Sequence, residues 1–194
     1  MSVATLLVCV VVAVAHSAAA IQAGAPCGGA NAGDCLMTNR RGAPRSYGAH
    51  SGNDFGSYDL NIYAIWPGTI EHAYNTGAGY GNQIRIRHAP SDHGFDGNTY
   101  YSEYSHMAWF NRGISKGARV CRGTLLGKMG ATGGNYAVHL HLDVLRGNSL
   151  IGFCTSGIAP GVCSNTGYSP VREISPRMHC GPGSSSSPPS SPPS

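Results

Sequence analysis

The chain has 194 residues, of which only 11% are charged, and 13 basic against 9 acidic residues give a formal net charge of +4. This length allows one domain with a sizeable core. The charge is weak and forms no basic run, so we expect no nucleic-acid partner, whereas mild basicity is compatible with anionic surfaces such as cell-wall polymers.

The first 20 residues have the pattern of a secretory signal peptide. Leu6–Ala15 forms an apolar core of about ten residues, which is too short to span a bilayer comfortably. Three alanines at 18–20 offer a cleavage site before Ile21. We therefore expect a secreted, extracellular protein with no stable membrane association, and an uncleaved anchor is the alternative.

Removal of the signal would leave six cysteines, and an even number in a secreted chain predicts disulfides. Six cysteines allow fifteen connectivities. The simplest joins near neighbours and leaves one long-range bond, that is Cys27 with Cys35, Cys154 with Cys163, and Cys121 with Cys180. No Cys-x-x-Cys spacing occurs, so we do not expect a cysteine zinc site.

Composition also separates the ends of the chain from its middle. Residues 21–45 are rich in Gly, Ala and Asn and predict an irregular lead-in stapled by the first cysteine pair. Residues 151–180 are turn-rich and hold three cysteines, which predicts a disulfide-rich extension. Residues 181–194 are almost entirely Ser and Pro, so we expect a disordered tail.

The middle of the chain predicts β-structure, because 28 glycines and 10 tyrosines occur without long helical periodicity. Short strands are expected at residues 59–65, 69–73, 83–88, 100–107 and within 120–129. His93 lies in a polar loop and is expected to be exposed to solvent. The fold expected is all-β, an antiparallel two-layer β-sheet domain with short strands and long loops, stapled by disulfides.

The run from His139 to Val144 alternates most clearly. Strand side chains alternate between faces, so His139 and His141 share one face and Val138, Leu140, Leu142 and Val144 take the other. A polar strand face with two exposed histidines would explain the pattern. A metal site or a catalytic site would explain it equally well, because imidazole is a favoured zinc ligand and a good general base.

Further candidates lie upstream. His50 and Asp54 are four residues apart in a segment whose glycines argue against a helix, so an extended or looped backbone would have to bring them together. Both side-chain types suit zinc. His106 follows in a later predicted strand.

In this order the motifs resemble the lysostaphin-type zinc metalloendopeptidases, which cut bacterial peptidoglycan peptides. Residues 50–54 match the family's His-x-Gly-x-Asp, and Tyr104–Met107 resembles its Tyr-x-His-Leu. Residues 130–133 match Gly-x-Thr-Gly, and His139–Val144 resembles His-Leu-His-Phe-Glu-Val with Asp for Glu. The resemblance covers about residues 45–147 and implies a zinc endopeptidase domain over 46–150.

Carried over residue by residue, the resemblance implies that His50, Asp54 and His141 bind Zn²⁺ and that His106 and His139 are the catalytic histidines. The family pattern, not the spacing, assigns His141 rather than His139 to the metal. Peptidoglycan peptides are the implied substrate, and the implied activity is bacteriolytic.

Two alternatives stay open. The six cysteines and the Ser/Pro tail are atypical of the bacterial enzymes and are similar to a secreted animal relative, the leukocyte cell-derived chemotaxin type, which keeps a zinc site without the full catalytic set. Such a protein would recognise without cutting. A latent precursor is the other alternative, with residues 21–45 covering the site and Asn31 or Asp34 near the metal.

Overall fold

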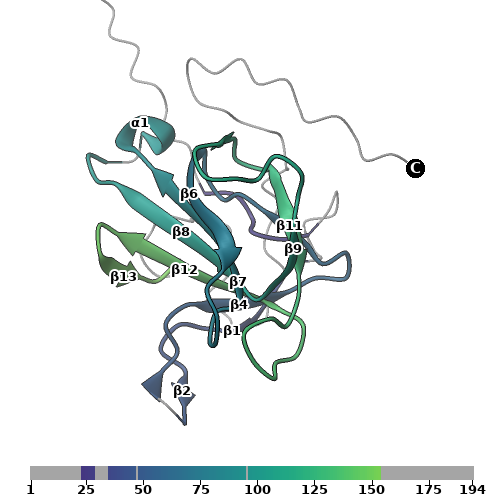
Figure 1. The fold of residues 1–194 in the computed structure, drawn as a ribbon. Coiled ribbons are helices and arrows are strands. Elements are labelled where there is room, and N and C mark those ends of the chain that lie inside the picture. Colours follow the sequence, from purple (N-terminus) through teal and green to yellow (C-terminus); the bar gives the residue numbers. More distant parts are fainter. Residues whose placement is uncertain (1–22, 29–34, 47, 95, 154–194) are drawn as a thin grey trace, which may run out of the picture.

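The computed structural model describes residues 23–28, 35–46, 48–94 and 96–153 (Figure 1). The expected signal peptide, the Ser/Pro tail, and Asn31 and Asp34 lie outside these residues, as does nearly all of the extension expected over 151–180. Among the described residues, no helix has the length and hydrophobicity needed to cross a membrane.

The main sheet has eight strands, and every pairing within it is antiparallel. Its path runs through β1 (Leu36–Asn39), β4 (Asn53–Gly56), β12 (Leu140–Arg146), β8 (Tyr100–Ser105), β7 (Asn82–His88), β6 (Gly68–Asn75) and β10 (Arg119–Val120), with β13 (Ser149–Ile151) paired to β12.

Two smaller sheets complete the domain. The three-stranded sheet has the order β5 (Asn61–Tyr63), β11 (Leu125–Met129) and β9 (Met107–Phe110), and β2 (Pro44–Arg45) pairs with β3 (Gly48–Ala49) as a separate hairpin. The single helix in the described part of the chain is the one-turn α1 (Pro90–His93). The expectation of an all-β, antiparallel fold is confirmed.

The hydrophobic core joins the main sheet to the three-stranded sheet, which lies beside it in Figure 1. Leu140 and Leu142 of β12 and Tyr104 of β8 contribute from the main sheet, and Leu126 of β11 contributes from the smaller one. Because side chains alternate, His141 projects from the opposite face of β12. The apolar face thus anchors the strand, and the other face is free to build a polar site.

The lead-in differs from expectation. Residues 36–39 are not irregular: they form β1, the edge strand beside β4, with Leu36 opposite Gly56 and Met37 opposite Phe55. Backbone pairing to an already ordered strand satisfies the groups that a loop would leave to water.

The disulfide between Cys27 and Cys35 is confirmed. Cys121 is disulfide-bonded as well. Its expected partner Cys180, and the expected pair of Cys154 with Cys163, lie outside the described residues.

Two other expectations were wrong. His93 is fully buried, because α1 folds the segment back so that its ring packs on Trp66 and Tyr100 and hydrogen-bonds the carbonyl of Asn98. Val138 is 53% exposed, because β12 begins only at Leu140 and strand alternation does not extend to it.

Candidate metal centre

Two of the three candidate ligands, Asp54 and His141, lie close together because their strands are neighbours in the sheet. Asp54 of β4 and His141 of β12 are directly opposed in the antiparallel register. His50 lies three residues before β4, where its backbone is hydrogen-bonded on both sides: its N–H donates to Ala43 and its carbonyl accepts from Gly42. This pairing curls the segment and brings His50 Nε2 to within 3.1 Å of Asp54 Oδ1.

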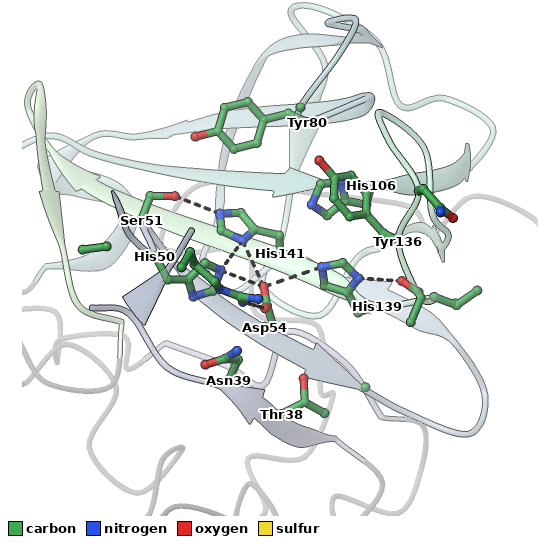
Figure 2. A pocket seen from close by; sticks show the side chains of 17 residues that line it. Thr38, Asn39, His50, Ser51, Asp54, Tyr80, His106, Tyr136, His139 and His141 are labelled. Atoms are coloured by element: carbon green, nitrogen blue, oxygen red, sulfur yellow. Dashed lines mark hydrogen bonds and ion pairs between the residues drawn. The ribbon is translucent and has the colours of Figure 1, made fainter. Parts of the chain in front are cut away.

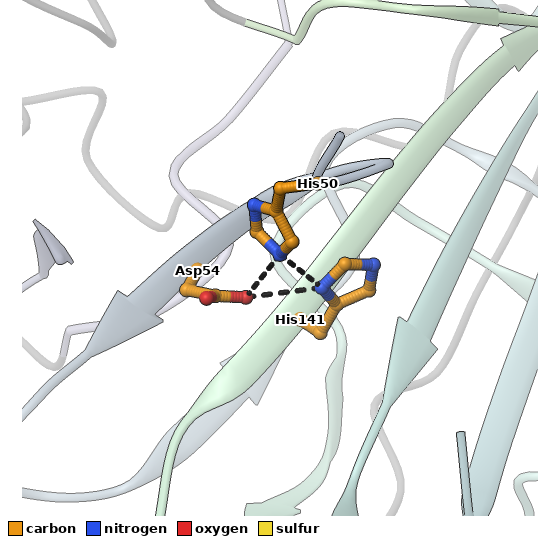
Figure 3. Close-up of side chains that lie close together, drawn as sticks. All are labelled: His50, Asp54 and His141. Carbon is orange, nitrogen blue, oxygen red and sulfur yellow. Dashed lines mark hydrogen bonds and ion pairs between the residues drawn. The ribbon is translucent and has the colours of Figure 1, made fainter. Parts of the chain in front are cut away.

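His50, Asp54 and His141 form a compact buried triangle (Figure 3). His50 Nε2 is 3.0 Å from His141 Nδ1 and 3.1 Å from Asp54 Oδ1, and the last two atoms are 3.0 Å apart. Ligand atoms at about 2.0–2.1 Å from a tetrahedral zinc lie roughly 3.3 Å from one another. The donor set and its spacing therefore fit a zinc ion.

The other nitrogen of each ligand ring is held by an outer partner. His50 Nδ1 lies 3.1 Å from the carbonyl of Arg40, which only accepts, so Nδ1 carries the proton. His141 Nε2 lies 3.0 Å from a carboxylate oxygen of Asp143 and 3.1 Å from the hydroxyl of Ser51. Both rings thus direct one nitrogen toward the triangle, which is the nitrogen that would bind a metal ion after losing its proton.

Asp54 is oriented in the same way. Its Oδ2 accepts a hydrogen bond from the Arg45 guanidinium at 2.8 Å, which leaves Oδ1 to face the two rings. Three lone pairs that converge repel one another unless a cation lies among them. The geometry is that of a cation site.

The pKa values of the metal-free site also indicate that positive charge is favoured between the three ligand atoms. Burial would lower the pKa of His141, but hydrogen bonds to the carboxylates of Asp143 and Asp54 outweigh it and raise this pKa to about 9. Burial would raise the pKa of Asp54, but its hydrogen bond to His141 and the nearby imidazoles lower it. A proton therefore occupies the site where the three atoms could hold a metal ion.

The two histidines expected to be catalytic lie beside the triangle (Figure 2). The ring centroids of His106 and His139 are 4.7 Å apart, and His139 Nε2 is 3.6 Å from Asp54 Oδ1. His106 Nδ1 donates to the carbonyl of Thr132 at 3.0 Å, and His139 Nδ1 donates to that of Ala137 at 2.7 Å. When either ring is neutral, its lone pair is therefore on Nε2.

His106 occupies the junction of β8 and β9 with a left-handed φ of 62°, which is uncommon for a residue other than glycine. Burial lowers its pKa to about 4, although its hydrogen bond to Thr132 opposes this. Thr132 is itself fixed, because its hydroxyl donates to the carbonyl of Met107 and accepts from the N–H of Asn82. The Gly-x-Thr-Gly motif thus positions a neutral His106.

All five residues that the sequence predicted line one cleft of about 970 Å³. The sequence analysis missed the outer partners Arg40, Ser51, Asp143 and Arg45. Asp143 could have been found, since it lies two residues after His141 on the same strand face. The role of Arg45 could not be predicted from the sequence pattern, because a hairpin and a tertiary contact bring it to Asp54.

Residues 48–151 match the family model described as Peptidase family M23. The match spans more than half of the chain, and the chain belongs to this family of metallopeptidases. The assignment agrees with the resemblance drawn from the motifs. A comparison with curated proteins finds no match.

The first two of the following three solved structures share the fold. A zinc-containing peptidase from Vibrio cholerae is 22% identical with a TM-score of 0.55, over 68% of this chain and 39% of that one. A mutant catalytic domain of the prophage-encoded M23 protein EnpA from Enterococcus faecalis is 22% identical with a TM-score of 0.52, over 69% and 97% of the two chains. The catalytic domain of the antimicrobial peptidase lysostaphin from Staphylococcus simulans is 28% identical with a TM-score of 0.46, over 57% and 79%.

Proposed function

We propose that this protein is a secreted zinc metalloendopeptidase that hydrolyses peptide bonds in bacterial peptidoglycan. Family membership supports the metallopeptidase class. The observation that carries the proposal is the convergence of three ligand atoms and two further histidines in one cleft.

His50, Asp54 and His141 would hold the zinc. Two imidazoles and one carboxylate are a donor set that hydrolytic zinc sites use, because three protein ligands leave one position open to water or substrate. When bound, zinc supplies Lewis acidity that activates water and polarises a carbonyl.

His106 and His139 would move protons and stabilise charge beside the metal. The low pKa of His106 keeps its ring neutral, so Nε2 accepts a proton from the attacking water and later returns one to the leaving amine. His139 lies next to His106, and its imidazole, once protonated, would stabilise the developing oxyanion.

The test is mass spectrometry of the muropeptides released from defined cell walls by the zinc-loaded protein, with and without a chelator. We expect peptide-bond cleavage that the chelator abolishes. His106→Ala should lose roughly a hundredfold or more in turnover and keep its zinc, since general acid–base catalysis contributes about 10²–10⁴-fold. His141→Ala should lose the metal itself, as metal analysis would reveal.

His72→Ala is the matched control, because it removes a half-buried imidazole of β6 that does not line the cleft. Zinc-loaded protein that releases no peptide from any wall type would contradict the proposal. That result would favour the alternative of a secreted zinc-containing protein of the leukocyte cell-derived chemotaxin type, which recognises without cutting.

A further inference from the structure

The cleft has a lining of two chemical kinds. The cleft is lined by Tyr80, Tyr136 and Val138, all large and between 41% and 53% exposed. Its polar lining includes Thr38, Asn39 and Arg45. Figure 2 shows Tyr80 on one side of the ligand triangle and Thr38 and Asn39 on the other. A peptide laid across the metal would therefore meet both aromatic rings and polar groups.

Beside this polar lining lies a second hollow of about 390 Å³, lined by residues 37–44, which we call the arginine hollow. Thr38 and Asn39 line both spaces, so the hollow adjoins the cleft. Arg40 and Arg41 contribute two exposed guanidinium groups to it. None of the described residues that line it is acidic.

The backbone that carries these arginines is fixed. The carbonyl of Arg40 accepts from the ligand His50, and the next residue but one, Gly42, donates to the His50 carbonyl. The Arg41 guanidinium donates to the carbonyl of Leu150 at 3.4 Å. The cationic groups therefore project from an ordered edge, which reduces the entropy lost on binding a ligand.

Among the described residues, Asp54 is the single carboxylate that lines the cleft or the hollow, and it already pairs with Arg45 and with the ligand histidines. Arg40 and Arg41 therefore add positive charge to the hollow beside the cleft, and no carboxylate of the described lining offsets this charge. Guanidinium groups match carboxylates in planar, often bidentate hydrogen bonds.

We propose that the arginine hollow is a subsite for a free carboxylate group of the peptide substrate, on one side of the scissile bond. This inference rests on the proposed peptidase function and adds a substrate preference to it. Arg40, Arg41 and Arg45 all precede residue 48, where the family match begins, so the preference belongs to this chain's own N-terminal edge.

The experiment uses two synthetic stem peptides that differ only in whether one carboxyl group is free or amidated. Both kcat/KM and the binding constant, from fluorescence anisotropy of labelled peptides, are measured on the zinc-loaded full chain. Arg40→Gln/Arg41→Gln is the test variant. Arg112→Gln/Lys116→Gln is the control, because it removes the same charge from exposed residues that line neither space.

We expect the protein to prefer the free carboxylate by roughly tenfold, the size of one charge-assisted hydrogen bond. The test variant should lose this preference and the control should keep it. Equal handling of both peptides by the unaltered protein, or a preference that survives in the test variant, would overturn the subsite.

The two proposals fail separately. If neither peptide is cut but the free carboxylate still binds about tenfold tighter through Arg40 and Arg41, the subsite stands and the peptidase function fails. If both peptides are cut equally well, the function stands and the subsite fails. If neither peptide binds, the subsite is rejected.

Discussion

Each candidate metal ligand turns one atom toward the triangle and has its other polar atom tied to a fixed partner. The partners are the Arg40 carbonyl for His50, the Asp143 carboxylate for His141 and the Arg45 guanidinium for Asp54. These contacts select the tautomer and the orientation before any metal binds. The site's affinity for metal therefore depends on residues that never touch the metal.

Asp143→Asn tests this dependence. The amide keeps the shape of the side chain but removes the negative charge that raises the basicity of His141. Zinc affinity should fall roughly ten- to hundredfold, the usual effect of losing such an outer partner. Competition titration with a chromophoric chelator measures it.

Glu103→Gln is the control for Asp143→Asn. Glu103 lies opposite Asp143 across the strand pair, but its carboxylate pairs with Arg85. If both variants lose affinity equally, the effect comes from general charge and not from the hydrogen bond to His141.

At the scale of elements, the centre depends on how closely the segment leading into β4 approaches β12. Gly52 lies between His50 and Asp54, and a Cβ there would overlap the Leu142 carbonyl and lie 2.6 Å from Asp143 Oδ1. Glycine in the His-x-Gly-x-Asp motif is therefore a packing requirement, since only a residue without a side chain lets the two ligand-bearing segments meet.

Gly52→Ala should force these segments apart. We expect a loss of about 1–3 kcal/mol in the free energy of unfolding, the usual cost of overpacking, together with weaker zinc binding. Denaturant unfolding of the metal-free protein checks the first effect. Gly56→Ala at the end of β4 is the control, because its Cβ would meet only Thr38 Cγ2 at 3.6 Å. Equal stability of the two variants would contradict the argument.

At the scale of the whole molecule, a second histidine cluster is buried in the fold without access to the cleft. His88 of β7 is fully buried, and its ring nitrogens contact the Pro67 carbonyl at 2.7 Å and the Ser102 hydroxyl at 2.8 Å. Burial lowers the pKa of His88 to about 4. The charge of Asp92 opposes this shift, and the charges of His93 and Arg119 add to it. The folded protein therefore favours the neutral form of this imidazole.

The stability of the metal-free protein should fall as the pH drops from about 6.5 toward 4. A histidine with a lowered folded-state pKa stabilises the fold fully above its unfolded pKa and loses that contribution as protons bind the unfolded state. For His88 the loss is at most about 3 kcal/mol. Unfolding in urea across this pH range, with a chelator present, measures it.

His106 has a lowered pKa too and contributes with the same sign. His88→Gln isolates the contribution of the buried ring, because its amide can still hydrogen-bond but does not titrate. The variant should lose less stability than the unaltered protein over the same pH range. Parallel losses in both proteins would exclude His88 as the cause.

The sequence by itself determined the fold class and the five residues that converge in the cleft. Period-two alternation predicted that His139 and His141 lie on one side of the chain, because that depends only on local backbone geometry. Both line the cleft, His141 from β12 and His139 from the bridge residue just before it. The order of the family motifs identified His50, Asp54 and His106 as further site residues. Their roles as ligands and catalytic groups remain predictions.

Only the tertiary structure decided which atoms surround those residues. The register of β4 against β12 opposes Asp54 to His141, and the curl before β4 turns His50 inward. Part of the lead-in forms the strand β1, because pairing with the neighbouring strand outweighs a glycine-rich composition. The same lead-in also contains Arg40 and Arg45. Contacts between segments far apart in the chain leave no local pattern, so the arginine hollow appears only once the chain is folded.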